Sequence, residues 1–167
     1  MKHTICALVE NKFGVLARIA GLFSARGFNI SSLTVGETED PSVSRMTIIV
    51  EGDDRTLEQI KKQLHKLIDV ITVYDLTKKG FVDRELLLIK VSAATPKIKE
   101  EIAAIAETLE AKTVNVGAKS ITLELTGEQE KIKSAFELLA PFGIREVVRT
   151  GRIAMALEER KEPIGGK

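Results

Sequence analysis

The sequence predicts an α+β protein made of two consecutive βαββαβ units. Short segments in which apolar and polar residues alternate indicate strands, and longer segments with an apolar residue every three or four positions indicate helices. These segments follow one another in the order βαββαβ, and the same order recurs in the second half of the chain. Each unit is therefore predicted to be an antiparallel sheet with its helices on one face. The predicted domains are residues 1–77 and 78–167, with a linker at 77–80.

The first unit begins with a short apolar strand, and glycine opens the helix that follows it. That helix has apolar residues at the spacing of one buried face, and an acidic turn containing proline separates the next two strands. The segments in order are a strand at 4–10, a helix at 14–26, strands at 28–38 and 44–51, a helix capped by Asp53 and a strand at 70–76.

The second unit repeats this pattern. Its first helix begins at Thr95-Pro96, where proline occupies a first-turn position that tolerates the missing N–H. The segments in order are a strand at 85–93, a helix from residue 95, a hairpin of 112–116 and 120–126 around Gly117, a helix at 127–139 and a last strand within 144–157. Residues 158–167 are charged, contain proline and glycine, and are expected to fray.

Composition excludes several classes of protein. Of the 167 residues, 44% are hydrophobic, which supports a core, and 29% are charged. No apolar run approaches the roughly 18 to 20 residues that span a bilayer, and the N-terminus lacks a signal-peptide cleavage pattern. We therefore expect no membrane association and a cytoplasmic location. The net charge of +1 leaves no basic surface for a phosphate backbone, so nucleic-acid binding is not expected either.

No catalytic or metal-binding residues are predicted. Cys6 is the only cysteine, which rules out an intrachain disulfide, and it is expected to be a buried thiol within a strand. His3 and His65 are far apart in the sequence and lack ligand spacing. Nucleophile elbows, phosphate loops and dinucleotide fingerprints are absent. A βαββαβ unit is also the topology of RNA-recognition modules, but the corresponding strands carry no aromatic residue for base stacking.

The start of the first helix is the candidate binding site. Gly14 precedes the backbone N–H groups of Val15 and Leu16, which lack partners within the helix and favour a carboxylate or phosphate. Asn11 and Asn29 lie at strand ends, and their side chains both donate and accept hydrogen bonds. Two interpretations remain open from these residues alone. They are ordinary turn and capping residues, or they bind a zwitterionic amino acid.

Other features also have two interpretations. Arg45 is either a surface charge or a partner contact, and Gly117 and Gly151 are expected to serve turns or strand irregularities. The charged residues within 145–152 are expected to form a solvated face of a strand. One face of each predicted sheet lacks helices, so we expect self-association or a partner to cover it.

The chain resembles the small, regulatory subunit of acetohydroxyacid synthase (acetolactate synthase), whose N-terminal part is an ACT domain. The resemblance rests on the segments FGVLARIAGLFSARGFNI, SLTVGETED, SRMTI and EQIKKQLHKLIDV, and more loosely on REVVRTGRIAMAL. It implies two tandem ferredoxin-like sandwiches, of which the first is the ACT domain. It also implies a chain without an active site, because thiamine diphosphate, FAD and magnesium belong to the large catalytic subunit.

The resemblance further implies how such a chain acts. It would bind and activate the large catalytic subunit and confer feedback inhibition by valine or a related branched-chain amino acid. The ACT domains would form a homodimer with a continuous sheet and with the effector between the two chains. Carried over by position, the effector site would comprise Asn11, Gly14, Val15 and Leu16 of one chain and Asn29 and Ile30 of the other. Gly36 departs from members that carry a side chain at this position, which puts the strength of the effector in doubt.

The polar segment 34–46 next to this site is the candidate contact for the large subunit, through Thr34, Arg45 and Met46. Two rival functions remain. A stand-alone ACT-type amino-acid sensor or transcriptional regulator is opposed by the absence of a helix-turn-helix pattern and of a basic face. A small α/β enzyme is opposed by the missing nucleophile, base and metal ligands.

Overall fold

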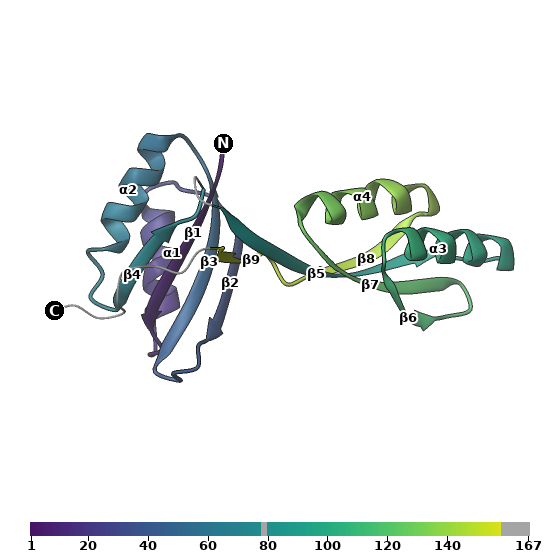
Figure 1. Ribbon diagram of the computed structural model, residues 1–167, viewed down its shortest axis with the longest axis horizontal. Helices are drawn as coiled ribbons and strands as arrows, with labels where there is room; N and C mark the ends of the chain where they lie inside the picture. Colours follow the sequence, from purple (N-terminus) through teal and green to yellow (C-terminus); the bar gives the residue numbers. More distant parts are fainter. Residues whose placement is uncertain (78–79, 158–167) are drawn as a thin grey trace. The chain divides into compact units, whose positions relative to one another are not determined.

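The computed structural model describes residues 1–77 and 80–157, which divide into two compact units (Figure 1). Unit 1 contains residues 1–82 together with the segment that follows Gly151, and unit 2 contains residues 83–151. The domain boundary predicted from the sequence differs from this division, because the chain returns to unit 1 after completing unit 2. The predicted linker falls partly on residues 78–79, and the predicted frayed end on 158–167, which lie outside the described residues.

Unit 1 is a four-stranded antiparallel sheet with two helices on one face, as Figure 1 shows. The strand order is β2-β3-β1-β4, so β2 and β4 are the edges of the sheet. The elements are β1 (Lys2–Glu10), α1 (Val15–Ala25), β2 (Ile30–Glu37), β3 (Val43–Glu51), α2 (Asp54–Leu64) and β4 (Val70–Asp75). The βαββαβ prediction is confirmed, although β2 begins two residues later than expected.

The core of unit 1 lies between the helices and one face of this sheet. Helix α1 contributes residues at helical spacing, and alternate residues of β1 and β3 face them. The fully buried members include Phe23, Ile5, Ile48 and Met46. Met46 was predicted to contact a partner, and this prediction is wrong because its side chain is completely enclosed in the core.

Helix α2 begins as the sequence predicts. The side chain of Asp53 accepts a hydrogen bond from the backbone N–H of Thr56 at 2.7 Å. This hydrogen bond satisfies one free N–H of the first turn, and it holds the pKa of the Asp53 carboxyl below its usual value.

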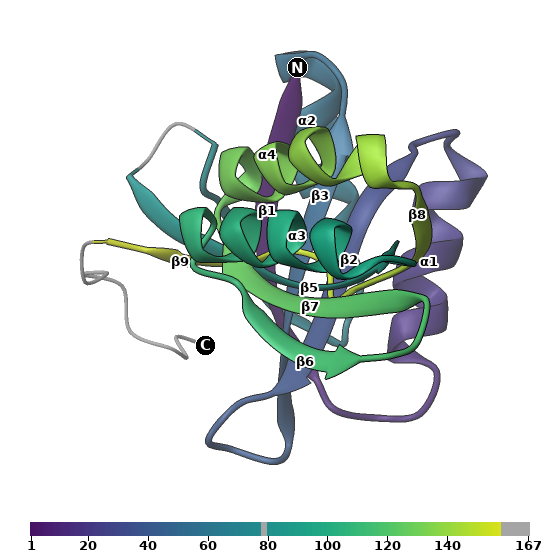
Figure 2. The same cartoon turned by 90° about the vertical axis from the view of Figure 1, so that its right-hand side faces the viewer.

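Unit 2 repeats the topology of unit 1. Its strand order is β6-β7-β5-β8, and Figure 2 shows helices α3 and α4 side by side over one face of the sheet. The elements are β5 (Phe81–Ser92), α3 (Pro96–Thr108), β6 (Lys112–Val116), β7 (Ser120–Gly127), α4 (Gln129–Leu139), the short 3-10 helix η1 (Ala140–Phe142) and β8 (Ile144–Arg149). The predicted pair of tandem ferredoxin-like sandwiches is therefore confirmed, although Gly127 belongs to a strand and not to the helix.

The predicted last strand is in fact two strands. Strand β8 ends at Arg149, the chain turns at Gly151, whose φ of 84° favours glycine, and β9 (Ile153–Ala156) follows. Strand β9 pairs with β5 and packs on the face of the unit 1 sheet that the helices leave open. Cys6, Leu76 and Ala154 are buried in this second cluster. The buried thiol is confirmed, and part of the face that was expected to need a partner is covered by the chain itself.

No helix in the described part of the chain is long and apolar enough to cross a membrane.

Candidate functional site

The turn between β1 and α1 leaves the start of the helix uncapped. Gly14 occupies the N-cap position with a φ of 78°, and no side chain caps the helix. The N–H of Val15 makes only a long hydrogen bond of 3.4 Å to the carbonyl of Lys12. Among the described residues no acceptor pairs with the N–H of Leu16, and the first turn contains no acidic residue. The positive end of the helix dipole therefore lacks a negative partner among the described residues of unit 1.

A guanidinium group lies beside this helix start. A Cβ on Gly14 would lie 3.2 Å from Nη1 of Arg18, so both the backbone conformation and the available space favour glycine here. Asp69, which is only 8% exposed, holds Arg18 in place, since its Oδ2 accepts from Nε at 2.9 Å and lies 2.7 Å from Nη2. The site thus combines the weakly bonded N–H of Val15 and the unpaired N–H of Leu16 with a guanidinium whose charge Asp69 partly balances. Backbone N–H groups and a guanidinium both suit a carboxylate ligand.

Asn11 anchors the turn to the rest of unit 1. Its Nδ2 donates to Oε1 of Glu37 and to the carbonyl of Pro41, each at 2.9 Å, and its backbone N–H donates to the carbonyl of Ser42 at 2.7 Å. Both amide protons are therefore in use, and among the described residues no group donates to the side-chain carbonyl oxygen. The sequence led us to expect that the Asn11 side chain both donates to and accepts from a ligand. In the structure it can only accept, for example from an ammonium group.

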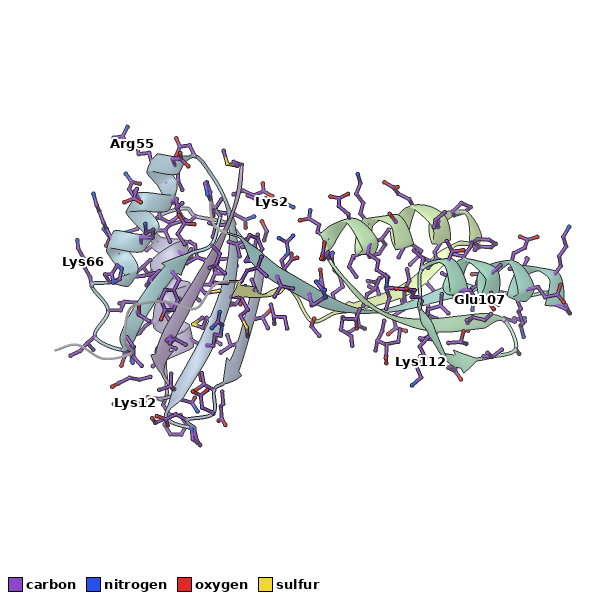
Figure 3. All side chains as sticks on the ribbon, viewed as in Figure 1. Lys2, Lys12, Arg55, Lys66, Glu107 and Lys112 are labelled. Carbon is purple, nitrogen blue, oxygen red and sulfur yellow. The ribbon has the colours of Figure 1, made fainter. Side chains whose placement is uncertain are left out.

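An open pocket of about 480 Å³ lies at this turn and is lined by Asn11, Lys12 and Phe13. Figure 3 shows Lys12 at the end of unit 1 opposite to Lys2. Lys12 pairs with Glu10 at 2.7 Å, and this hydrogen bond raises the pKa of the ammonium group. Phe13 is fully exposed and Leu16 is 47% exposed, which places apolar surface beside the polar groups.

Asn29 and Ile30 lie at the other end of the sheet. Ile30 pairs with Val50, whereas Glu37, the partner of Asn11, pairs with Ser44. The stretch of β3 from Ser44 to Val50 is roughly 20 Å long. One chain therefore brings together Asn11, Gly14, Val15 and Leu16 of the predicted effector site but leaves Asn29 and Ile30 apart. Asn29 is exposed, Ile30 is half-buried, and Val15 offers only its backbone because its side chain lies in the core.

Thr34 and Arg45 hold the last strand of their own chain. Oγ1 of Thr34 donates to the carbonyl of Arg152 at 3.2 Å, and Nη2 of Arg45 donates to the carbonyl of Ala154 at 2.9 Å. Ser32, which the sequence did not single out, accepts from the N–H of Arg152 at 3.1 Å. Arg45 is therefore neither a free surface charge nor an outward contact, because its guanidinium faces β9.

The predicted solvated face within 145–152 contains an exception. Arg149 forms two hydrogen bonds of 2.7 Å with Glu85, a residue only 7% exposed, and its guanidinium lies 5.7 Å from the ring centre of Phe136. The hydrogen bonding to Glu85 raises the pKa of Arg149. This ion pair joins β5 to the last residue of β8 within unit 2 and contributes to its structure.

The described residues contain no candidate metal centre. No group of three potential metal-ligating side chains occurs in residues 1–77 and 80–157. His3 is buried, and its Nε2 lies 3.1 Å from the carbonyl oxygen of Gly52. The arrangement is suited to binding a small anion or zwitterion, and the residues that sequence reasoning missed are Arg18 and Asp69. Arg18 could have been noticed in the sequence, because it lies in the first turn of a predicted helix. The helix dipole disfavours a positive charge there unless a carboxylate pairs with it.

Two family descriptions match most of the chain. Residues 5–72 match an AHAS small subunit-like ACT domain, and residues 84–158 match the small subunit of acetolactate synthase.

Individual proteins match over nearly the full length. The chain is 50% identical to a probable acetolactate synthase small subunit of Archaeoglobus fulgidus, over 96% of this chain and 100% of that protein. It is 48% identical to the acetolactate synthase small subunit of Aquifex aeolicus, over 94% of this chain and 82% of that protein. The crystal structure of the acetolactate synthase small subunit from Thermotoga maritima is similar with a TM-score of 0.86 and 40% identity, and the match covers 96% and 99% of the two chains.

Proposed function

The chain belongs to the family of acetolactate synthase small subunits, which are regulatory and not catalytic, and we propose that it activates a large catalytic subunit and makes it sensitive to valine or a related branched-chain amino acid. The observation that carries this proposal is the uncapped start of α1 at Gly14, with free N–H groups beside a fixed guanidinium. We place the complex in the cytoplasm, with thiamine diphosphate, FAD and magnesium held by the large subunit.

Pairing of two chains through β2 would complete the site. Strand β2 is an edge of the sheet, and an edge strand presents unpaired backbone groups to a second strand. In a twofold antiparallel pair of β2 strands, the start of one strand lies beside the end of the other. Asn29 of one chain would then approach Glu37 and Asn11 of the other. A homodimer of this kind joins the two groups of residues that one chain keeps roughly 20 Å apart.

The chemistry of the assembled site matches an α-amino acid. The ligand carboxylate would accept from the N–H groups at the start of α1 near Arg18. Its ammonium group would donate to the free carbonyl oxygen of Asn11 and to Asn29 of the second chain. A small apolar side chain would lie against Leu16 and Phe13, which are exposed in a single chain.

A ligand that touches both chains can act as an effector. It shifts the equilibrium between dimer arrangements only by the difference in its affinity for them. Coupling free energies of about 1 to 3 kcal/mol are typical of allostery, and they are reciprocal for binding. The proposed inhibited state is therefore a dimer geometry that holds the catalytic subunit less well in its active form.

Mixing the purified chain with its large subunit tests this function. Acetolactate formation is measured with the large subunit alone, with both subunits, and with both subunits plus valine. We expect the chain to raise the rate and valine to reverse the increase. A rate that responds neither to the chain nor to valine would contradict the proposal, and a response to leucine or isoleucine alone would change the effector.

A further inference from the structure

Strand β9 exposes its large apolar side chains and buries its small ones. Ile153 and Met155 of β9 are 54% and 60% exposed, and Leu157, directly after the strand, is 70% exposed. Ala154 is buried against Cys6 and Leu76, and Ala156 packs on the same cluster. Val82, on the paired strand β5, is a further 37% exposed. We call Val82, Ile153, Met155 and Leu157 the β9 ridge.

Hydrogen bonds to other strands of unit 1 fix the backbone that carries the ridge. Arg152 is bonded through its N–H to Ser32 and through its carbonyl to Thr34, while the carbonyl of Ala154 accepts from Arg45. Leu157 donates its N–H to the carbonyl of Gly80 at 3.0 Å. An ordered strand with its large apolar residues in water is unfavourable for an isolated chain, whereas such a surface is usual at the centre of a protein interface.

We propose that the β9 ridge is the apolar centre of the surface that binds the large catalytic subunit. This inference rests on the proposed function and adds the contact surface to it. The ridge spans no charged residue, since the stretch from Ile153 to Leu157 consists of isoleucine, methionine, leucine and alanine. It therefore fits an apolar depression on the partner. Thr34 and Arg45 take the part of positioning residues that hold β9, while β9 itself provides the contact.

A second copy of this chain fits the ridge less well than the large subunit. Strand β2 is an edge of its sheet, and in the proposed homodimer it supplies the closed twofold contact between copies. A second self-association through the ridge would join such dimers into larger assemblies or filaments unless their axes closed a point group. The area of the ridge also favours the large subunit as its partner. A stable interface buries roughly 800 Å² of each partner, and the four ridge side chains supply only the centre of such an area. A larger partner provides the surrounding rim.

The position of the ridge also connects the partner to the effector. Ser32 and Thr34 belong to β2, the strand that begins next to Asn29. A change at the paired β2 edges would thus reach β9 through two side-chain hydrogen bonds and would require no movement of the helices.

Charge introduced on the ridge provides the test. The variants are Met155→Glu and Ile153→Glu, with Met155→Leu as the conservative change. Ile68→Glu is the matched control, because Ile68 is 96% exposed and lies in the loop between α2 and β4. Each variant is measured for its Kd with the cognate large subunit, for its self-association by sedimentation, for its thermal unfolding and for valine binding. We expect both ridge variants to weaken the large-subunit Kd by about thirtyfold, as central interface residues do. Met155→Leu and Ile68→Glu should stay within about twofold, and valine binding should not change.

The outcomes separate this inference from the proposed function. Wild-type affinity in both folded ridge variants would overturn the ridge as the contact while leaving the regulatory function intact. Loss of self-association with unchanged affinity for the large subunit would show that a second copy occupies the ridge, which also overturns the inference. A wild-type chain that does not bind the large subunit at all would overturn both.

Discussion

The two units share one topology but differ in how their first helix begins. The sheets have equivalent strand orders, β2-β3-β1-β4 and β6-β7-β5-β8. In unit 2 the first helix begins conventionally, with the hydroxyl of Thr95 accepting from the N–H of Ile98 at 3.3 Å. In unit 1 the equivalent helix begins at Gly14 without a capping side chain. The contrast teaches that the first turn is free for a ligand in one unit and satisfied internally in the other.

The units also differ in how they secure their strands. In unit 1, β9 returns after unit 2 is complete and covers part of the open sheet face. In unit 2, the ion pair of Glu85 and Arg149 instead joins β5 to the end of β8. The two copies of one fold therefore differ in their contacts, and the proposed binding surfaces both lie on unit 1.

The largest loss of stability is expected from removing the ion pair between Glu85 and Arg149 in unit 2. Arg149→Met leaves the carboxylate of Glu85 buried without its partner, which should lower the free energy of unfolding by about 3 kcal/mol. Denaturant unfolding measures this loss. Arg149→Lys should cost less, because the charge remains although the two-pronged geometry is lost. An Arg149→Met chain as stable as the wild type would mean that the pair contributes nothing net.

The next effect concerns the β9 cover of unit 1. Ala154→Asp buries a carboxylate against Cys6 and Leu76 and should displace β9 at a cost of about 2 kcal/mol. Because Cys6 is the only cysteine, its rate of reaction with a thiol reagent reports the displacement directly. Val148→Asp, at a residue 53% exposed on β8 of unit 2, is the control and should change stability by no more than about 0.5 kcal/mol. Equal protection of Cys6 in Ala154→Asp and in the wild type would contradict the described cover.

A smaller effect is expected at the two helix starts when each receives an aspartate. In Gly14→Asp the new carboxylate would occupy the N–H groups and approach Arg18, so that valine should bind about tenfold or more weakly while activation persists. Thr95→Asp replaces one good capping residue by another and should leave valine binding unchanged. Calorimetry measures both. Wild-type valine affinity in Gly14→Asp would show that the carboxylate does not bind at this helix start.

The smallest effect comes from removing the cap in unit 2. Thr95→Ala should lower the stability of the protein by about 1 kcal/mol, because the N–H of Ile98 loses its acceptor. The melting temperature of the variant gives this value, and valine inhibition should remain as in the wild type. A change in inhibition with this variant would mean that the helix start of unit 2 also takes part in regulation.

Most of the fold was predictable because hydrophobic period and turn chemistry are local properties. Asp53 and Thr95 are residue types that commonly cap helices, so they indicate where α2 and α3 begin. Gly14 indicates the start of α1 only because it directly precedes the apolar helical pattern. Strand β9 was not predictable as a separate element, since its docking depends on Ser32 and Thr34, which are distant in the sequence. The prediction that Met46 contacts a partner was wrong because residues 46–50 are buried on both faces of the sheet. The alternation of apolar and polar residues therefore does not show which side chains of this segment face the core.

The candidate site was predictable only in part. The glycine and the two asparagines follow from residue types that suit turns and ligands. The pairing of Arg18 with Asp69 depends on tertiary structure, because the two residues belong to different elements that only folding brings together. The distance between Asn11 and Asn29 likewise follows from the strand register and not from the residues themselves.

The proposed sharing of one site between two chains has a direct test. A heterodimer is prepared by coexpressing Gly14→Asp and Asn29→Ala chains with different tags, and its valine binding is titrated by calorimetry. One of its two sites would combine the intact Gly14 of one chain with the intact Asn29 of the other. The account predicts half the wild-type stoichiometry at wild-type affinity, whereas each homodimeric variant binds weakly. A heterodimer that binds valine no better than either variant alone would contradict it.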